Sequence, residues 1–74
     1  MLNACLLIKV VPTKSDAILE AIHQVKGVRR AYSTYGRFDI AVFLEVEDYK
    51  ALRGITSQIN SIDGVRSTET LAEA

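Results

Sequence analysis

Two short polar segments carry residues suited to binding a small zwitterion such as a free amino acid. Such a ligand needs an acceptor for its ammonium group and several donors for its carboxylate. Asp39 is a candidate acceptor, and Gly36 lets backbone N–H groups approach an anion closely. Thr68 and Thr70 lie two residues apart and therefore share one face of a strand. The candidate ligand-binding residues are Tyr35, Gly36, Arg37, Phe38, Asp39, Thr68 and Thr70.

Most of these residues also have a purely structural interpretation. Gly36 is a turn residue that needs a positive φ, whether or not it also contacts a ligand. Asp39 can accept hydrogen bonds from the hairpin backbone. Thr68 and Thr70 are ordinary strand formers. Arg37 is either solvated or placed to favour an acidic or amide side chain on the ligand.

The length and composition indicate that residues 1–74 form one small domain, which we expect to oligomerise. Hydrophobic residues make up 49% of the chain, yet a core of this size supplies only about 3–5 kcal/mol. A single cysteine excludes an intrachain disulfide, and one histidine and one cysteine far apart give no metal site. No cofactor is expected. Small domains without disulfides or metals are often stabilised by association.

The charge balance argues against direct nucleic-acid binding, because nine basic residues are matched by nine acidic ones. The apolar run from Leu2 to Val11 is interrupted by Asn3 and Lys9 and lacks a basic leader, so we expect neither a signal peptide nor a membrane span. We therefore expect a cytoplasmic location.

An internal repeat indicates the strands and helices that carry these residues. Residues 22–29 and 59–66 share the pattern I-x-x-[IV]-x-G-V-R. Each copy is typical of a helix end, a glycine stop and a strand start. We expect strands at Ala4–Ile8, Val28–Tyr35, Phe38–Val46 and Val65–Leu71, with a turn at Gly36-Arg37. Helices are expected before Gly27, with Ile18, Ala21, Ile22 and Val25 buried, and before Gly64, with Leu52, Ile55, Ile59 and Ile62 buried.

Capping residues locate the helix starts. Thr13 or Ser15 is expected to cap the first helix, after Pro12 has ended the preceding strand. Asp48 is expected to cap the second helix.

The order βαββαβ predicts an α+β, ferredoxin-like fold with an antiparallel sheet in the order 4-1-3-2. Its two helices cover one face, so the other face presents apolar residues that we expect to form a dimer by stacking of two sheets. These dimer-interface candidates are Cys5, Leu7, Ala41 and Phe43.

Two motifs, G-x-[FY]-D at Gly36–Asp39 and G-V-x-S-T-E-T-L at Gly64–Leu71, closely resemble the effector-binding (RAM) domain of the Lrp/AsnC, or feast/famine, regulators. The resemblance covers essentially all 74 residues. Full-length members also carry a helix-turn-helix that this sequence lacks, so the chain resembles a stand-alone effector domain. It implies a homodimer formed through the sheets, rings of dimers with amino acids bound between them, and a full-length family regulator as a possible partner.

The strand order places the two motifs at opposite sides of the sheet, so a shared site would most simply combine different subunits.

The favoured function is a non-enzymatic amino-acid sensor. One alternative is an enzyme of the small dimeric α+β barrel type, although His23 is the only histidine and no nucleophile–base pair is evident. The other is an oligomeric adaptor that binds no metabolite.

Overall fold

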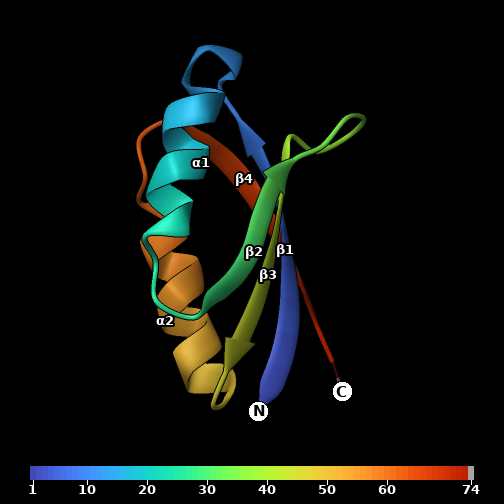
Figure 1. Cartoon of the computed structure of the whole chain (residues 1–74), viewed down its shortest axis with the longest axis vertical. Helices are drawn as coiled ribbons and strands as arrows, with labels where there is room; N and C mark the ends of the chain where they lie inside the picture. Colours follow the sequence, from blue (N-terminus) through green and yellow to red (C-terminus); the bar gives the residue numbers. More distant parts are fainter. Residues whose placement is uncertain (74) are drawn as a thin grey trace.

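The computed structural model describes residues 1–73, which form a four-stranded antiparallel sheet with two helices on one face (Figure 1). The strands are β1 (Leu2–Val10), β2 (Val28–Ser33), β3 (Ile40–Val46) and β4 (Val65–Ala72), and the helices are α1 (Ser15–His23) and α2 (Tyr49–Asn60). A short 3-10 turn, η1 (Pro12–Lys14), precedes α1. The sheet order is β2-β3-β1-β4, so the predicted ferredoxin-like fold is confirmed.

The core lies between the two central strands and the helices. Ala4, Leu6 and Ile8 of β1 pair with Leu44, Val42 and Ile40 of β3, and all six are buried. Ile18 and Ile22 of α1 and Leu52 and Ile59 of α2 complete this core. Side chains alternate between the two faces of a strand, so every second residue of β1 and β3 packs under the helices.

The helix ends confirm part of the sequence-based prediction. Gly27 and Gly64 follow the helices with φ of 100° and 98°, which suits glycine. Asp48 caps α2, since its carboxylate accepts a hydrogen bond of 2.8 Å from the backbone N–H of Ala51. Ala21, in contrast, is exposed, because α1 presents Ile18 and Ile22 to the sheet instead.

The prediction of a side-chain cap on α1 was wrong. Lys14 occupies the N-cap position, and neither Thr13 nor Ser15 caps the helix. The chain first makes the 3-10 turn that begins with Pro12, in which the N–H of Lys14 bonds the carbonyl of Val11. A 3-10 turn, and not an extended residue, therefore precedes α1, so no side chain reaches the N–H groups of its first turn as an N-cap.

The predicted two-residue turn at Gly36-Arg37 was also too short, because residues 34–39 together connect β2 and β3. The N–H of Asp39 donates to the carbonyl of Ile8 at 2.9 Å, and the N–H of Thr34 donates to the carbonyl of Asp39 at 2.9 Å. These bonds begin the loop at Thr34 and end it at Asp39.

Within residues 1–73, no helix has the length and apolar character needed to cross a membrane.

Candidate functional site

The loop between β2 and β3 projects beyond the end of the sheet (Figure 1). Gly36 at its tip has a φ of 112°, and a Cβ added there would meet no atom within 4 Å. Glycine is thus required by the backbone conformation and not by packing. Tyr35 is fully exposed beside it, and the hydroxyl of Thr34 closes the loop by donating to the carbonyl of Phe38 at 2.8 Å. The loop therefore presents Tyr35, Gly36 and Arg37 to the surroundings.

Asp39 is held at the base of this loop by the end of β1. Its Oδ2 accepts a hydrogen bond of 3.0 Å from the backbone N–H of Val10, where the pairing of β1 with β4 is irregular. The structural interpretation of Asp39 as a backbone acceptor is thus partly correct, although the donor belongs to β1 and not to the hairpin. The carboxylate also lines a hollow of about 500 Å³, together with Lys9, Val10, Pro12, Arg66 and Ser67.

This hollow brings one carboxylate together with two cationic side chains. Lys9 and Arg66 can bind a ligand carboxylate, while Asp39 can accept from an ammonium group. The arrangement matches the charge pattern of a zwitterion. Asp39 was predicted from its motif, whereas Lys9, Arg66 and Ser67 were not predicted from the sequence. Arg66 and Ser67 lie inside the motif that carried the resemblance, next to the two threonines, so this motif could have indicated them. No signal in the sequence indicated the irregular strand pairing at Lys9 and Val10.

Thr68 and Thr70 share the helix-covered face of the sheet, since they pair with the buried residues Ile8 and Leu6. The hydroxyl of Thr68 donates to Oδ1 of Asn60 at 3.1 Å. Thr70 lines a second hollow, of about 300 Å³, with Tyr49, Leu52, Arg53 and Thr56 of α2. The two threonine side chains thus face α2 rather than the loop.

One chain brings Asp39 of the first motif beside Arg66 and Ser67 of the second, but it does not bring Thr68 and Thr70 to the loop. Thr68 pairs with Ile8, which in turn pairs with Ile40 at the start of β3. Two strand spacings, roughly 10 Å, therefore separate Thr68 from the strand that follows the loop. The expectation that the motifs need different subunits therefore holds for the loop and the threonines, but not for Asp39, Arg66 and Ser67, which share one hollow within a single chain.

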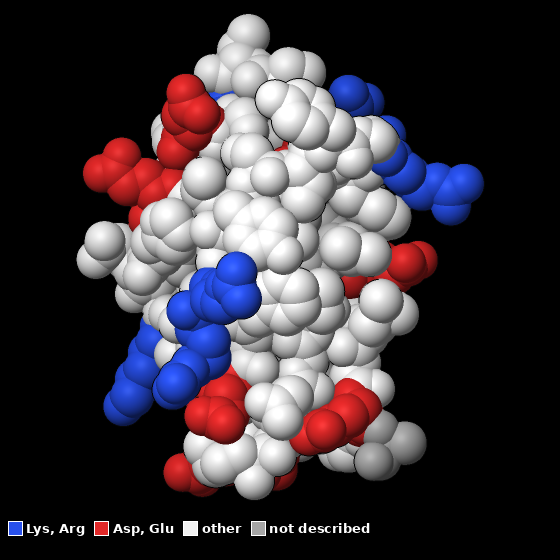
Figure 2. All heavy atoms as spheres, turned by 45° about the vertical axis from the view of Figure 1, so that its right-hand side comes forward, with Lys and Arg blue, Asp and Glu red and all other residues white. Residues whose placement is uncertain are grey.

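The face of the sheet opposite the helices carries the predicted interface residues. Cys5 pairs with Phe43 and Leu7 pairs with Ala41, all on this open face. Phe43 is 37% exposed and Tyr32 is 41% exposed, whereas Ala41 is already buried. Burial raises the pKa of the Cys5 thiol. Figure 2 shows a band of uncharged atoms running down this side of the molecule, with charged groups mostly toward its margins.

Fold and surface together define a small ferredoxin-like domain with one open apolar sheet face and ligand-sized hollows at its edges. The family model of the Lrp/AsnC ligand binding domain matches residues 3–72. The chain therefore belongs to the Lrp/AsnC family. A comparison with curated proteins found no match.

Solved structures agree with this assignment. The structure of TTHA0845 from Thermus thermophilus is 32% identical with a TM-score of 0.97, covering 100% of this chain and 94% of that one. FFRP-DM1 is 27% identical with a TM-score of 0.92, and each chain is covered completely. Escherichia coli AsnC is 24% identical with a TM-score of 0.89, covering 97% of this chain but 50% of its own. The fold is also shared, at 14% identity and a TM-score of 0.85, with the siroheme decarboxylase NirDL.

Proposed function

We propose that this protein is a small oligomeric regulator that binds an amino acid or a related zwitterionic metabolite at subunit interfaces. The observation that carries the proposal is the Asp39 carboxylate, fixed by Val10 and sharing one hollow with Lys9 and Arg66. Membership of a family whose matched domain is described as ligand binding supports it.

A second subunit is part of the proposal for two reasons. The open sheet face exposes aromatic side chains that stacking with another copy would cover. The exposed loop and the Thr70 hollow lie at different edges of one chain, so a loop from a neighbouring dimer is needed to combine them. A ring of dimers provides such neighbours.

The proposed output is a change in assembly, or in pairing with a full-length relative that binds DNA. Ligand bound across an interface stabilises the assembled state by mass action, so metabolite concentration sets oligomeric state. The proposed role is non-enzymatic and cytoplasmic, and it involves no direct contact with DNA. The equal numbers of basic and acidic residues support this last point.

Substitution of Asp39 tests the site while keeping the fold intact. Asp39→Asn retains a carbonyl oxygen that can accept from Val10 but removes the charge that would bind an ammonium group. We expect amino-acid binding, measured by calorimetry, to weaken about tenfold or more, because a charge-assisted hydrogen bond contributes about 1.5–3 kcal/mol. Asp16→Asn, an exposed acid on α1, is the matched control. Undiminished binding by Asp39→Asn would exclude this site.

A further inference from the structure

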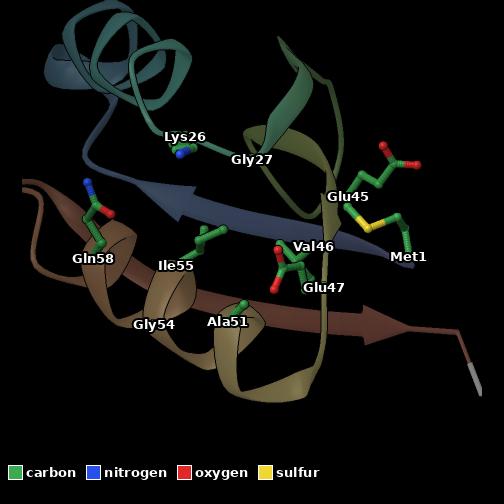
Figure 3. A pocket seen from close by; sticks show the side chains of 10 residues that line it. All are labelled: Met1, Lys26, Gly27, Glu45, Val46, Glu47, Ala51, Gly54, Ile55 and Gln58. Atoms are coloured by element: carbon green, nitrogen blue, oxygen red, sulfur yellow. The ribbon is translucent and has the colours of Figure 1, made fainter.

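A third hollow, separate from both motifs, lies where the α1–β2 turn, the end of β3 and α2 meet (Figure 3). It is a groove of about 580 Å³. Met1, Val46, Ala51 and Ile55 form its apolar part. Lys26, Glu45, Glu47 and Gln58 supply polar groups. None of the loop residues 34–39 and no residue of β4 contributes to it.

Gly54 in the middle of α2 also lines this groove, and the fold does not explain why the residue is glycine. Its φ is not positive, and a Cβ added there would meet no atom within 4 Å. Glycine is among the least favourable residues in a helix interior. Gly27 differs, since it has a φ of 100° and its added Cβ would lie 2.9 Å from Cδ1 of Ile55. The missing side chain of Gly54 leaves open space that belongs to the groove.

Opposite charges lie at the two ends of the groove. Figure 3 shows Lys26 and Gln58 toward one end and Glu45 and Glu47 toward the other, with Ile55 between them. Glu45 is engaged by Arg29, with 3.5 Å between Nη1 and Oε1. Across residues 1–73, neither Lys26 nor Glu47 forms an ion pair. Both charges are therefore available to a ligand.

We propose that this groove binds a small molecule with a carboxylate and an ammonium group at opposite ends of an aliphatic chain. The carboxylate accepts from the Lys26 ammonium and the Gln58 amide, the ammonium donates to the Glu47 carboxylate, and the methylene groups cover Ile55 beside Gly54. An α-amino acid with an apolar side chain carries both charged groups on one carbon, so it presents them together and not at opposite ends of a chain. This site is independent of the one proposed at Asp39.

The four glycines of the chain allow each site to be observed separately. In protein labelled with ¹⁵N-glycine, the amides of Gly27 and Gly54 report on the groove and that of Gly36 reports on the loop. Titration with 6-aminohexanoate should give saturable shifts at Gly27 and Gly54. Hexanoate and hexylamine, which each lack one charge, should bind about fivefold more weakly, because an exposed ion pair contributes up to about 1 kcal/mol. Equal binding of all three compounds, or no saturable shift at Gly27 and Gly54, would overturn the proposal.

Substitution at Gly54 tests the groove without destabilising the fold, so a loss of binding cannot be attributed to unfolding. Gly54→Leu raises helix propensity while filling the groove, so the shift at Gly27 should disappear from a protein at least as resistant to urea as the wild type. Ser57→Leu, on the same helix but outside the groove lining, is the matched control and should bind normally. Binding by Gly54→Leu at wild-type strength would rule the site out. A shift at Gly36 alone would support the Asp39 site and reject the groove.

Discussion

Tyr32 of β2 and Phe43 of β3 pack against each other with their ring centroids 5.9 Å apart, on the sheet face that the helices leave open. The guanidinium carbon of Arg30 lies 5.7 Å from the centroid of the Tyr32 ring. Aromatic pairs are worth about 0.5–1.5 kcal/mol beyond the area they bury, and they are enriched where proteins associate. The pair therefore forms an ordered aromatic surface at the place where we propose that two sheets stack.

Phe43→Asp should dissociate this dimer. A buried carboxylate facing a second sheet would lose hydration without a partner, so we expect the native mass to fall to that of a single chain. Lys50→Asp places the same charge on the exposed side of α2 and should leave the mass unchanged. Sedimentation measures the mass, and circular dichroism confirms that the fold is kept. A folded Phe43→Asp protein of unchanged mass would argue against the sheet-to-sheet dimer.

Cys5 should report on the same surface through its reactivity. Burial raises the pKa of its thiol, so less of the reactive thiolate is present at a given pH than in the unfolded chain. The stability that this shift contributes is present below the pKa of the unfolded thiol and is lost as pH rises through the folded value. We expect slow alkylation by iodoacetamide at pH near 8, and faster alkylation in Phe43→Asp and in urea. Native and unfolded protein reacting at the same rate would contradict the burial of Cys5.

Gly27 and Gly36 should respond differently to alanine. Both have positive φ, which costs an L-residue about 1–2 kcal/mol. At Gly36 the space around the new Cβ is open, whereas at Gly27 it would also overlap Ile55. Urea unfolding should show Gly27→Ala to be more destabilising, by roughly 1 kcal/mol or more. Equal losses of stability would mean that Ile55 moves away without cost.

Asp48→Ala should destabilise the protein by about 1 kcal/mol, because it removes the acceptor for the N–H of Ala51 at the start of α2. Asp16, in the first turn of α1, makes no such cap, so Asp16→Ala should cost only a few tenths of a kcal/mol. Urea unfolding at one protein concentration compares the two variants. Similar small losses would show that the Asp48 cap contributes little in solution.

Much of the fold follows from local signals in the sequence. Glycine at 27 and 64 is needed for left-handed backbone, and the nearly continuous apolar residues of β1 and β3, the most apolar of the four strands, indicate that these two lie at the centre of the sheet. The start of α1 was not predictable in this way, because a 3-10 turn leads into the helix. The long β2–β3 loop was missed because its end is fixed by two hydrogen bonds between residues far apart in the chain. Asp39 donates its N–H to the carbonyl of Ile8, and its carboxylate accepts from the N–H of Val10.

The candidate site was harder to predict than the fold. Asp39 was chosen from a motif, but Lys9 lies far from it in the chain, on β1, and shares the hollow with it only through the tertiary fold. Thr70 was expected near the ligand, and its side chain faces α2 of its own chain. A site completed by another subunit depends on how the subunits pack, and local patterns in one sequence do not predict that packing.

Amino-acid binding by an oligomer is best measured by calorimetry with each of the twenty amino acids. The protein should first be characterised by its native mass. We expect saturable heat for one or a few amino acids, at one site per subunit or per pair of subunits, and weaker binding by Asp39→Asn. Absence of binding by all twenty, from a well-folded oligomer, would contradict the account and favour an adaptor that acts through a protein partner.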